Sequence, residues 1–377
     1  MELRLGSFVP AAPVVLAPMA GVTNAPFRSL CRRFAPGLVY VNEMVMATAV
    51  VHGNAKTERM ISFDDDEQPR SLQLYGSDPE MMGRAVARVV DGGTVDHIDL
   101  NFGCPAAKVT RKGGGAAVPA RPRLLAAIVR AAVRAAEPAA VPVTAKFRIG
   151  LTDDLLTHLR AGEICAEEGV AAIALHARTV EQHYAGDARW DAIGELKAHV
   201  SSIPVLGNGD IWEAPDALAM MRTTGCDGVV IGRGCLGRPW LFEDLIAVLQ
   251  GRDVPDARPL GVVVDVMVEH ARALVDHHGH ELRAMQDFRK HASWYLTGYP
   301  VGPAVRRRAS QVSSVGEVED VVADLDRSLL VVAGGERIRR GHTNGPIRVS
   351  LPAGFLSADA DDATVPDDAG VMALSGG

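Results

Sequence analysis

The chain has 377 residues, of which 47% are hydrophobic and 23% charged, a composition typical of a soluble globular protein with a large core. No run of about 18 uninterrupted apolar residues occurs and no basic segment precedes an apolar one at the N-terminus, so we expect neither a membrane span nor a signal peptide. The five cysteines form no C-x-x-C pair, which disfavours a disulfide framework, a zinc ribbon and an iron–sulfur cluster. These features predict a cytoplasmic protein without a metal site.

The net charge of −7 argues mildly against a nucleic-acid partner. The acidic residues are concentrated at the C-terminus, because 11 acidic and 5 basic residues follow position 313. The rest of the chain is therefore close to neutral, and a local basic face can exist there.

Up to residue 246 the chain alternates short apolar runs with helical patterns, as parallel strands and their connecting helices do. Eight such units in about 240 residues match the size of a (β/α)8 TIM barrel, which we predict for residues 1–246. The expected strands cover residues 14–17, 38–41, 71–75, 97–101, 143–147, 172–176, 204–207 and 228–231. The clearest helical patterns cover residues 79–90, 122–136, 156–168 and 214–223.

Beyond the barrel, a segment rich in Gly, Asp, Arg and Pro at 250–259 predicts a linker. Helical spacing follows at 260–278, 282–296 and 311–330, which predicts a small all-helical domain over 255–330. Residues 331–377 show no clear period, and we expect a flexible acidic tail.

Catalytic groups of such a barrel lie at the C-terminal ends of its strands, and every predicted strand is followed by polar or glycine-rich residues. Cys104 follows the fourth strand on a loop with three consecutive glycines, which favours a mobile acid or nucleophile over a buried structural thiol.

Lys146 ends the fifth strand, where an unpaired ammonium is unfavourable. It is expected to meet an anion, such as the edge of a reduced flavin, the alternative being an ion pair with a barrel carboxylate. His176 and Arg178 share one face by strand alternation, so both are expected to face a ligand unless His176 is structural.

Glycine turns after the last two strands predict a phosphate site, because each exposes backbone N–H groups ahead of a helix. The residues concerned are Asn208, Gly209 and Asp210 after the seventh strand, and Gly232 and Arg233 after the eighth. The alternative is that these glycines only permit tight turns.

In the helical region, basic residues alternate with aromatic ones, a pattern typical of nucleic-acid contacts. Arg289 and Lys290 precede Trp294 and Tyr295, and the three arginines 306–308 follow. The alternative is an amphipathic helix with both aromatics in its core. Lys108, on the Cys104 loop, is a further candidate for contact with a polyanion.

Eight motifs, in order over about 300 residues, resemble the tRNA-dihydrouridine synthases, and most closely their main bacterial branch. DLNFGCP together with the GNGDI and IGRG turns is the most specific of them. The motifs are LAPMAGVTNAPFR at 16–28, QLYG at 73–76, DLNFGCP at 99–105, AKFR at 145–148, LHART at 175–179, GNGDI at 207–211, IGRG at 231–234 and RKHASWY at 289–295.

The resemblance implies an FMN-dependent barrel that reduces uridine in tRNA to 5,6-dihydrouridine, with NADPH as electron donor. Hydride would pass from FMN N5 to C6 of the uracil, and Cys104 would give the proton to C5. Carried over by position, the FMN contacts are Pro18, Met19 and Ala20 along the ring, Gln73 and Lys146 at its polar edge, His176 nearby, and Asn208, Gly209, Asp210, Gly232 and Arg233 at the phosphate. Asn101 and Arg178 would hold the target base, and Arg289 and Lys290 belong to the motif that resembles the family's tRNA-binding domain. Lys108 is expected to contact the tRNA from its place on the basic loop alone. Val180 departs from the pattern, because many members have an arginine there.

Two other functions stay open at this point. The chain can be an FMN barrel acting on a free pyrimidine, although such a substrate needs no basic helical domain. It can also be a tRNA-binding protein without catalysis, against which Cys104 and Lys146 argue. We expect a monomer.

Overall fold

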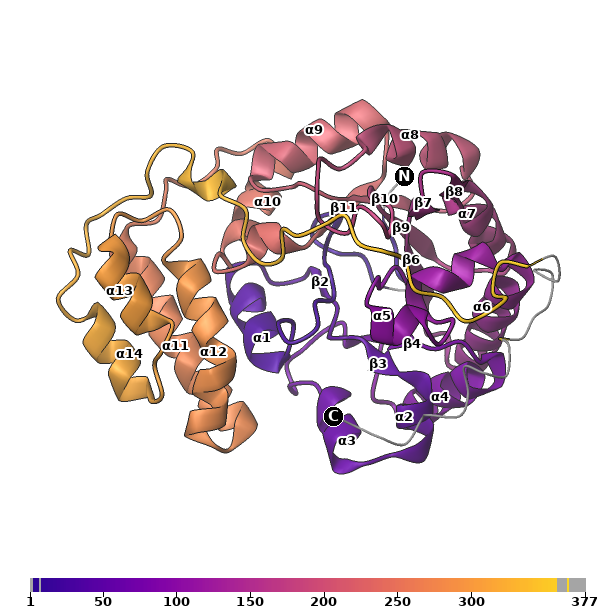
Figure 1. The fold of residues 1–377 in the computed structure, drawn as a ribbon, viewed down its shortest axis with the longest axis horizontal. Coiled ribbons are helices and arrows are strands. Elements are labelled where there is room, and N and C mark those ends of the chain that lie inside the picture. Colours follow the sequence, from indigo (N-terminus) through magenta and orange to yellow (C-terminus); the bar gives the residue numbers. More distant parts are fainter. Residues whose placement is uncertain (1–2, 7, 358–364, 366–377) are drawn as a thin grey trace.

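The computed structural model describes residues 3–6, 8–357 and 365, and its centre is a closed barrel of parallel strands (Figure 1). β1 pairs with both β11 and β2, and a bridge between Val41 and Ser71 joins β2 to β4 and closes the ring. The short β3 (Val45–Met46) follows β2 and also pairs with β4. The barrel strands are β1 (Val14–Leu16), β2 (Val39–Tyr40), β4 (Ser71–Tyr75), β5 (His97–Phe102), β6 (Val143–Arg148), β9 (Ala172–His176), β10 (Val205–Asn208) and β11 (Gly228–Ile231). The predicted TIM barrel is confirmed, and its strand positions agree to within one residue at each end.

Helices surround the barrel, and the longer ones bury an apolar stripe on their inner face. In α4 (Pro79–Asp91) the stripe includes Met82, Ala85 and Val89, and the helix begins where the Asp78 side chain accepts hydrogen bonds from two backbone N–H groups. The others are α1 (Ala25–Phe34), α2 (Ala47–His52), α3 (Ala55–Met60), α5 (Ala107–Thr110), α6 (Pro122–Ala136), α7 (His158–Glu167), α8 (Trp190–His199), α9 (Ala214–Thr224) and α10 (Leu241–Leu249). A small hairpin of β7 (Gly150–Thr152) and β8 (Leu155–Leu156) extends beyond β6.

The N-terminal residues fill the bottom of the barrel. Leu3 and Leu5 are buried among inward-facing strand residues that include Val15, Val39 and Leu206. This apolar contact closes the end of the barrel at which the strands begin. The opposite end, where the strands finish, carries the polar residues.

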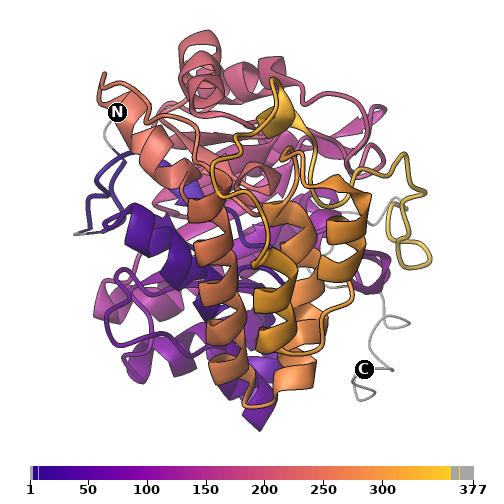
Figure 2. The same ribbon diagram turned by 90° about the vertical axis from the view of Figure 1, so that its left-hand side faces the viewer.

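Four helices form a bundle beside the barrel, shown from the side in Figure 1 and facing the viewer in Figure 2. They are α11 (Leu260–His278), α12 (Glu281–Tyr295), α13 (Gly302–Ala309) and α14 (Val315–Val322). Their apolar residues form a core of their own, which includes Met267 and Phe288 and takes in Leu30 of α1. The bundle therefore packs directly on the barrel.

The prediction of one long helix over 311–330 is wrong. α14 begins only at Val315, because the Ser314 side chain caps it by accepting a hydrogen bond from the backbone N–H of Glu317. The helix ends at Val322, and the preceding α13, which has Pro303 in its first turn, was not predicted.

The C-terminal segment, which we define as residues 331–357, returns from the bundle and crosses the mouth of the barrel (yellow in Figure 1). Its only helical turn covers Gly335–Arg337. Arg340 and Phe355 are only 3% and 1% exposed, so this path differs from the flexible tail expected from residue 331. The predicted tail continues to residue 377, and beyond residue 357 only residue 365 belongs to the described residues. None of the described helices is long and apolar enough to span a bilayer.

Candidate active site

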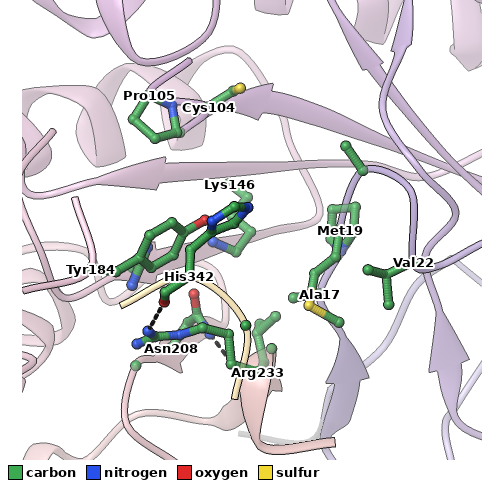
Figure 3. A pocket seen from close by; sticks show the side chains of 18 of the residues that line it. Ala17, Met19, Val22, Cys104, Pro105, Lys146, Tyr184, Asn208, Arg233 and His342 are labelled. Atoms are coloured by element: carbon green, nitrogen blue, oxygen red, sulfur yellow. Dashed lines mark hydrogen bonds between the residues drawn. The ribbon is translucent and has the colours of Figure 1, made fainter. Parts of the chain in front are cut away.

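A cavity of 800 Å³ lies at the C-terminal ends of the barrel strands (Figure 3). It brings together all the predicted site residues except Arg178 and Arg289. The predicted residues that line it are Pro18, Met19, Ala20, Gln73, Asn101, Cys104, Lys108, Lys146, His176, Asn208, Gly209, Asp210, Gly232, Arg233 and Lys290. In Figure 3, Cys104 lies on one side of the cavity and Asn208 and Arg233 on the other, with Lys146 between them.

The Cys104 thiol is held at the cavity wall by its own loop. The backbone N–H of Cys104 donates to Asn101 Oδ1 at 2.8 Å, and its carbonyl accepts from the N–H of Ala116 at 3.1 Å. Gly115 has φ +55°, and a Cβ there would lie 2.9 Å from the Cys104 carbonyl oxygen, so only glycine fits. Burial raises the pKa of Cys104 above its usual value of 9.0, and a backbone hydrogen bond from Ala106, followed by the charges of Arg148 and Lys108, opposes that rise. The group is therefore a protonated thiol at neutral pH.

A chain of buried hydrogen bonds supports the residue that orients the cysteine. Asn101 Nδ2 donates to Gln73 Oε1 at 2.7 Å, and Gln73 Nε2 donates to Asp99 Oδ2 at 2.6 Å. Thr144 Oγ1 donates to the other carboxylate oxygen of Asp99 at 2.6 Å. Since an amide nitrogen has two hydrogens, Gln73 keeps one donor for a ligand.

Lys146 presents an unpaired amine to the cavity. It makes no hydrogen bond or ion pair with any residue that the structure describes, so the alternative of an ion pair with a barrel carboxylate is wrong. Burial, followed by the charge of Arg148, lowers the pKa of Lys146 to about 7, although Asp99 opposes both effects. Arg148 also lines the cavity, where its guanidinium donates to the Gly103 carbonyl at 2.9 Å and to the Thr179 carbonyl at 2.9 Å. An anionic ligand edge would restore the full charge on Lys146.

His176 lies near the cations Lys146 and Arg148, and its own ring is neutral. Burial, followed by Arg148 and Lys146, holds the pKa of His176 well below its usual value of 6.5. Among the described residues it has no hydrogen-bond partner, which does not fit a structural histidine with satisfied ring nitrogens.

The ends of β10 and β11 form a cradle of hydrogen-bond donors. The backbone N–H groups of Asp210, Gly232 and Arg233 donate to no acceptor in the described part of the chain. The Arg233 guanidinium lies beside them, and burial and Arg178 lower its pKa to about 10. Such a set of donors suits a phosphate group.

Several cavity residues were not among the predicted site residues. Tyr184, from the loop after β9, has its ring 4.7 Å from the guanidinium carbon of Arg233 and 5.7 Å from that of Arg148. The guanidinium carbon of Arg233 also lies 5.2 Å from the centre of the Trp212 ring. His342 comes from the C-terminal segment. Tyr184 was missed because it lies eight residues beyond its strand, where the strand-end rule gives no signal.

Arg178 does not reach the cavity, so the expectation that it faces a ligand is wrong. It is fully buried, and its Nη2 donates to both carboxylate oxygens of Asp210, at 2.8 and 2.7 Å, and to the Gly186 carbonyl at 2.8 Å. Strand alternation failed because β9 ends at His176, and the N–H of Arg178 turns back to the His176 carbonyl. Arg178 therefore positions the loop that carries Asp210.

The basic and aromatic residues of α12 have different environments. Arg289 donates from Nε to the Val312 carbonyl at 2.9 Å inside the bundle, and Tyr295 is buried in the bundle core. Lys290 and Trp294 instead line the cavity, and Lys290 forms an ion pair with Asp287. The alternative that both aromatic residues lie in the core of an amphipathic helix is therefore correct for Tyr295 and wrong for Trp294.

All five cysteines are free thiols. Within the described residues, no group of three or more His, Cys, Asp or Glu side chains is arranged to hold a metal ion.

Comparison with known proteins identifies the family. The family model described as "Dihydrouridine synthase (Dus)" matches residues 15–330. The chain is 51% identical to a Mycobacterium tuberculosis protein named "Probable tRNA-dihydrouridine synthase", over 99% of this chain and 97% of the relative. It is 50% identical to a Mycobacterium leprae protein of the same name, over 96% of this chain and 100% of the relative. A Pseudomonas putida protein named "tRNA-dihydrouridine synthase B" is 38% identical, over 81% of this chain and 89% of the relative. As the motifs predict, the chain belongs to the dihydrouridine synthase family.

Proposed function

We propose that this protein reduces uridine in tRNA to 5,6-dihydrouridine, with FMN as cofactor and NADPH as electron donor. The observation that carries the proposal is one cavity that places the Cys104 thiol across from a phosphate cradle, with the unpaired Lys146 amine between them. Family membership supports the same reaction.

The residues of the cavity fit a flavin mononucleotide. The unpartnered N–H groups of Gly232 and Arg233 would hold its phosphate, and Lys146 would face the electron-rich edge of its ring. Met19 and Ala17 line the cavity with apolar surface suited to the ring itself. A volume of 800 Å³ lies within the usual range for cofactor sites. The bound flavin would supply hydride to the substrate.

The protein's own groups would hold the base and deliver the proton. The raised pKa of Cys104 keeps its proton available at neutral pH, so the thiol can act as a general acid. Asn101 fixes the loop that carries this thiol. Protonated Lys146 would stabilise negative charge that develops beside it.

A uridine must leave its base stack to enter a cavity at the barrel mouth, which requires roughly a few kcal/mol. Contacts elsewhere on the tRNA would offset this energy. Lys108 at the cavity, and the exposed Arg307 of α13, are candidates for phosphate contacts, because neither has a partner in the described part of the chain.

The test compares Cys104→Ala with Cys165→Ala, a control that removes a buried thiol of α7 that does not line the cavity. Wild type and both variants should show a flavin absorption band that NADPH bleaches. Only Cys104→Ala should form little dihydrouridine in tRNA from cells that lack this protein. A colourless wild-type protein that does not take up added FMN would refute the cofactor, and normal turnover by Cys104→Ala would remove the thiol from the mechanism.

The same assays separate the alternative functions. An oxidoreductase for free pyrimidines would be coloured and would consume NADPH with a free base but not with tRNA. A non-catalytic tRNA-binding protein would bind tRNA and leave its uridines unchanged.

A further inference from the structure

The C-terminal segment lies outside the part of the chain that defines the family, yet it lines the cavity. The family model ends at residue 330, whereas Gly341 and His342 are cavity residues. The match to the Mycobacterium tuberculosis relative includes this segment, because it covers 99% of the chain.

A buried arginine fixes the segment where it leaves the bundle. Arg340 donates to the carbonyls of Glu336 at 2.8 Å, Thr297 at 3.2 Å and Trp294 at 3.4 Å. Two of these carbonyls belong to α12 and the turn that follows it, and Trp294 itself lines the cavity. The path of the next residues is thereby tied to the wall of the site.

The residues that follow contact the phosphate cradle directly. Arg233 Nη1 donates to the backbone carbonyl of His342 at 2.6 Å. The His342 ring stacks on Tyr184, with 6.1 Å between ring centroids and 19° between planes. Tyr184 in turn lies against the guanidinium of Arg233. The positions of the Arg233 guanidinium and of the Tyr184 ring therefore both depend on the position of residue 342.

A short run of hydrogen bonds then joins the segment to the loop after β9. The Asn344 carbonyl accepts from the N–H of Tyr184 at 3.3 Å and lies 3.1 Å from His183 Nδ1. The N–H of Ile347 donates to the Glu181 carbonyl at 2.8 Å. Between these bonds, Gly345 has φ +151°, and a Cβ there would overlap the Gln182 carbonyl. The two strands of backbone approach this closely only because residue 345 is glycine.

We propose that residues 340–347 are a wall of the active site that positions Arg233 and Tyr184 around the phosphate of the cofactor. This inference rests on the proposed function, because it takes the phosphate-bearing ligand to be FMN. The His342 carbonyl accepts from Nη1 of the Arg233 guanidinium, and Nη2 lies 3.6 Å from Asp210 Oδ1. A guanidinium has five N–H donors, so the remaining hydrogens stay available for the phosphate. The His342 and Tyr184 rings cover the same end of the cavity and would slow release of the ligand.

The test moves this wall without removing any group that would bind FMN. Gly345→Ala forces the segment away from the loop after β9. Gly334→Ala is the matched control, because Gly334 also has positive φ, +73°, but nothing lies within 4 Å of an added Cβ. FMN affinity is measured by quenching of FMN fluorescence on titration with flavin-free protein.

In Gly345→Ala the shifted segment should no longer hold Arg233 in place, and Arg233 should lose one charge-assisted hydrogen bond to the phosphate. We therefore expect FMN to bind about tenfold more weakly to Gly345→Ala than to Gly334→Ala. A second variant, His342→Ala, removes only an exposed ring and should speed FMN release while folding normally. If wild type binds FMN and both Gly345→Ala and His342→Ala bind and release it as wild type does, the inference is overturned and the proposed function is untouched. If wild type itself binds no FMN, the proposed function and the inference fail together.

Discussion

Replacing Lys146 with methionine should make the flavin-free protein more stable at neutral pH, although it removes the amine that we propose faces the flavin. Burial lowers the pKa of Lys146 from its usual value of 10.5 to about 7. Between these two pH values the unfolded chain carries a proton on this amine that the folded protein does not. The contribution of Lys146 to the free energy of unfolding therefore rises with pH across this window, and below the window this amine destabilises the folded protein by the full amount. Methionine removes the ionisable group and with it the penalty.

The size of the effect follows from the two pKa values. At pH 7 they correspond to roughly 4 kcal/mol of unfolding free energy. With an unfolding entropy of about 2.1 cal/mol/K per residue over 377 residues, this equals a rise of about 5 °C in Tm. The gain should shrink as the pH increases and vanish near the usual value of 10.5.

Thermal unfolding of flavin-free protein, recorded between pH 6 and pH 10, measures this gain. Lys56→Met, at an exposed position of α3, is the control and should leave Tm unchanged at every pH. The reasoning is refuted if Lys146→Met is no more stable than wild type at pH 7, or if its advantage is the same at pH 7 and pH 10.

Further predictions concern the cysteine loop and the tRNA. Because burial raises the pKa of Cys104, its alkylation by iodoacetamide should accelerate as the pH rises above 8; a rate independent of pH would contradict this. Phe355→Ala should speed that alkylation, since a Cβ on Gly113 of the loop would lie only 2.8 Å from the Phe355 ring; an equal rate in both proteins would show that Phe355 does not restrain the loop. Replacing Lys108 and Arg307 by glutamine should lower the salt slope of tRNA affinity by about one per charge, and an unchanged slope would exclude phosphate contacts there.

The barrel was predictable because its signals are local. Each strand is a short apolar run, and residues that follow a strand at the C-terminal rim converge whatever the connecting helices do. Cys104 and Lys146 were found by this rule, which needs only the position of a residue relative to its strand. The helices after residue 296 were harder, because a serine cap and a proline divide a pattern that looks continuous in hydrophobicity.

The rest of the site depends on contacts between distant parts of the chain. Arg178 is directed toward Asp210, 32 residues away, and nothing in the local pattern distinguishes that carboxylate from a ligand. His342 reaches the cavity 109 residues after its partner Arg233. A segment with no hydrophobic period gives no indication that its backbone carbonyls accept hydrogen bonds from distant side chains, and such a sequence predicts a flexible tail.

The position of the cavity wall in the gene has a consequence for biogenesis. Domains usually fold during translation from the N-terminus onward, so the barrel strands leave the ribosome well before residues 340–347 do. A nascent chain with a complete barrel still lacks the carbonyl of residue 342 that holds Arg233. Loading of the cofactor would then wait for the synthesis of this segment, and a stop codon between the end of the bundle and residue 340 would yield folded but poorly loaded protein.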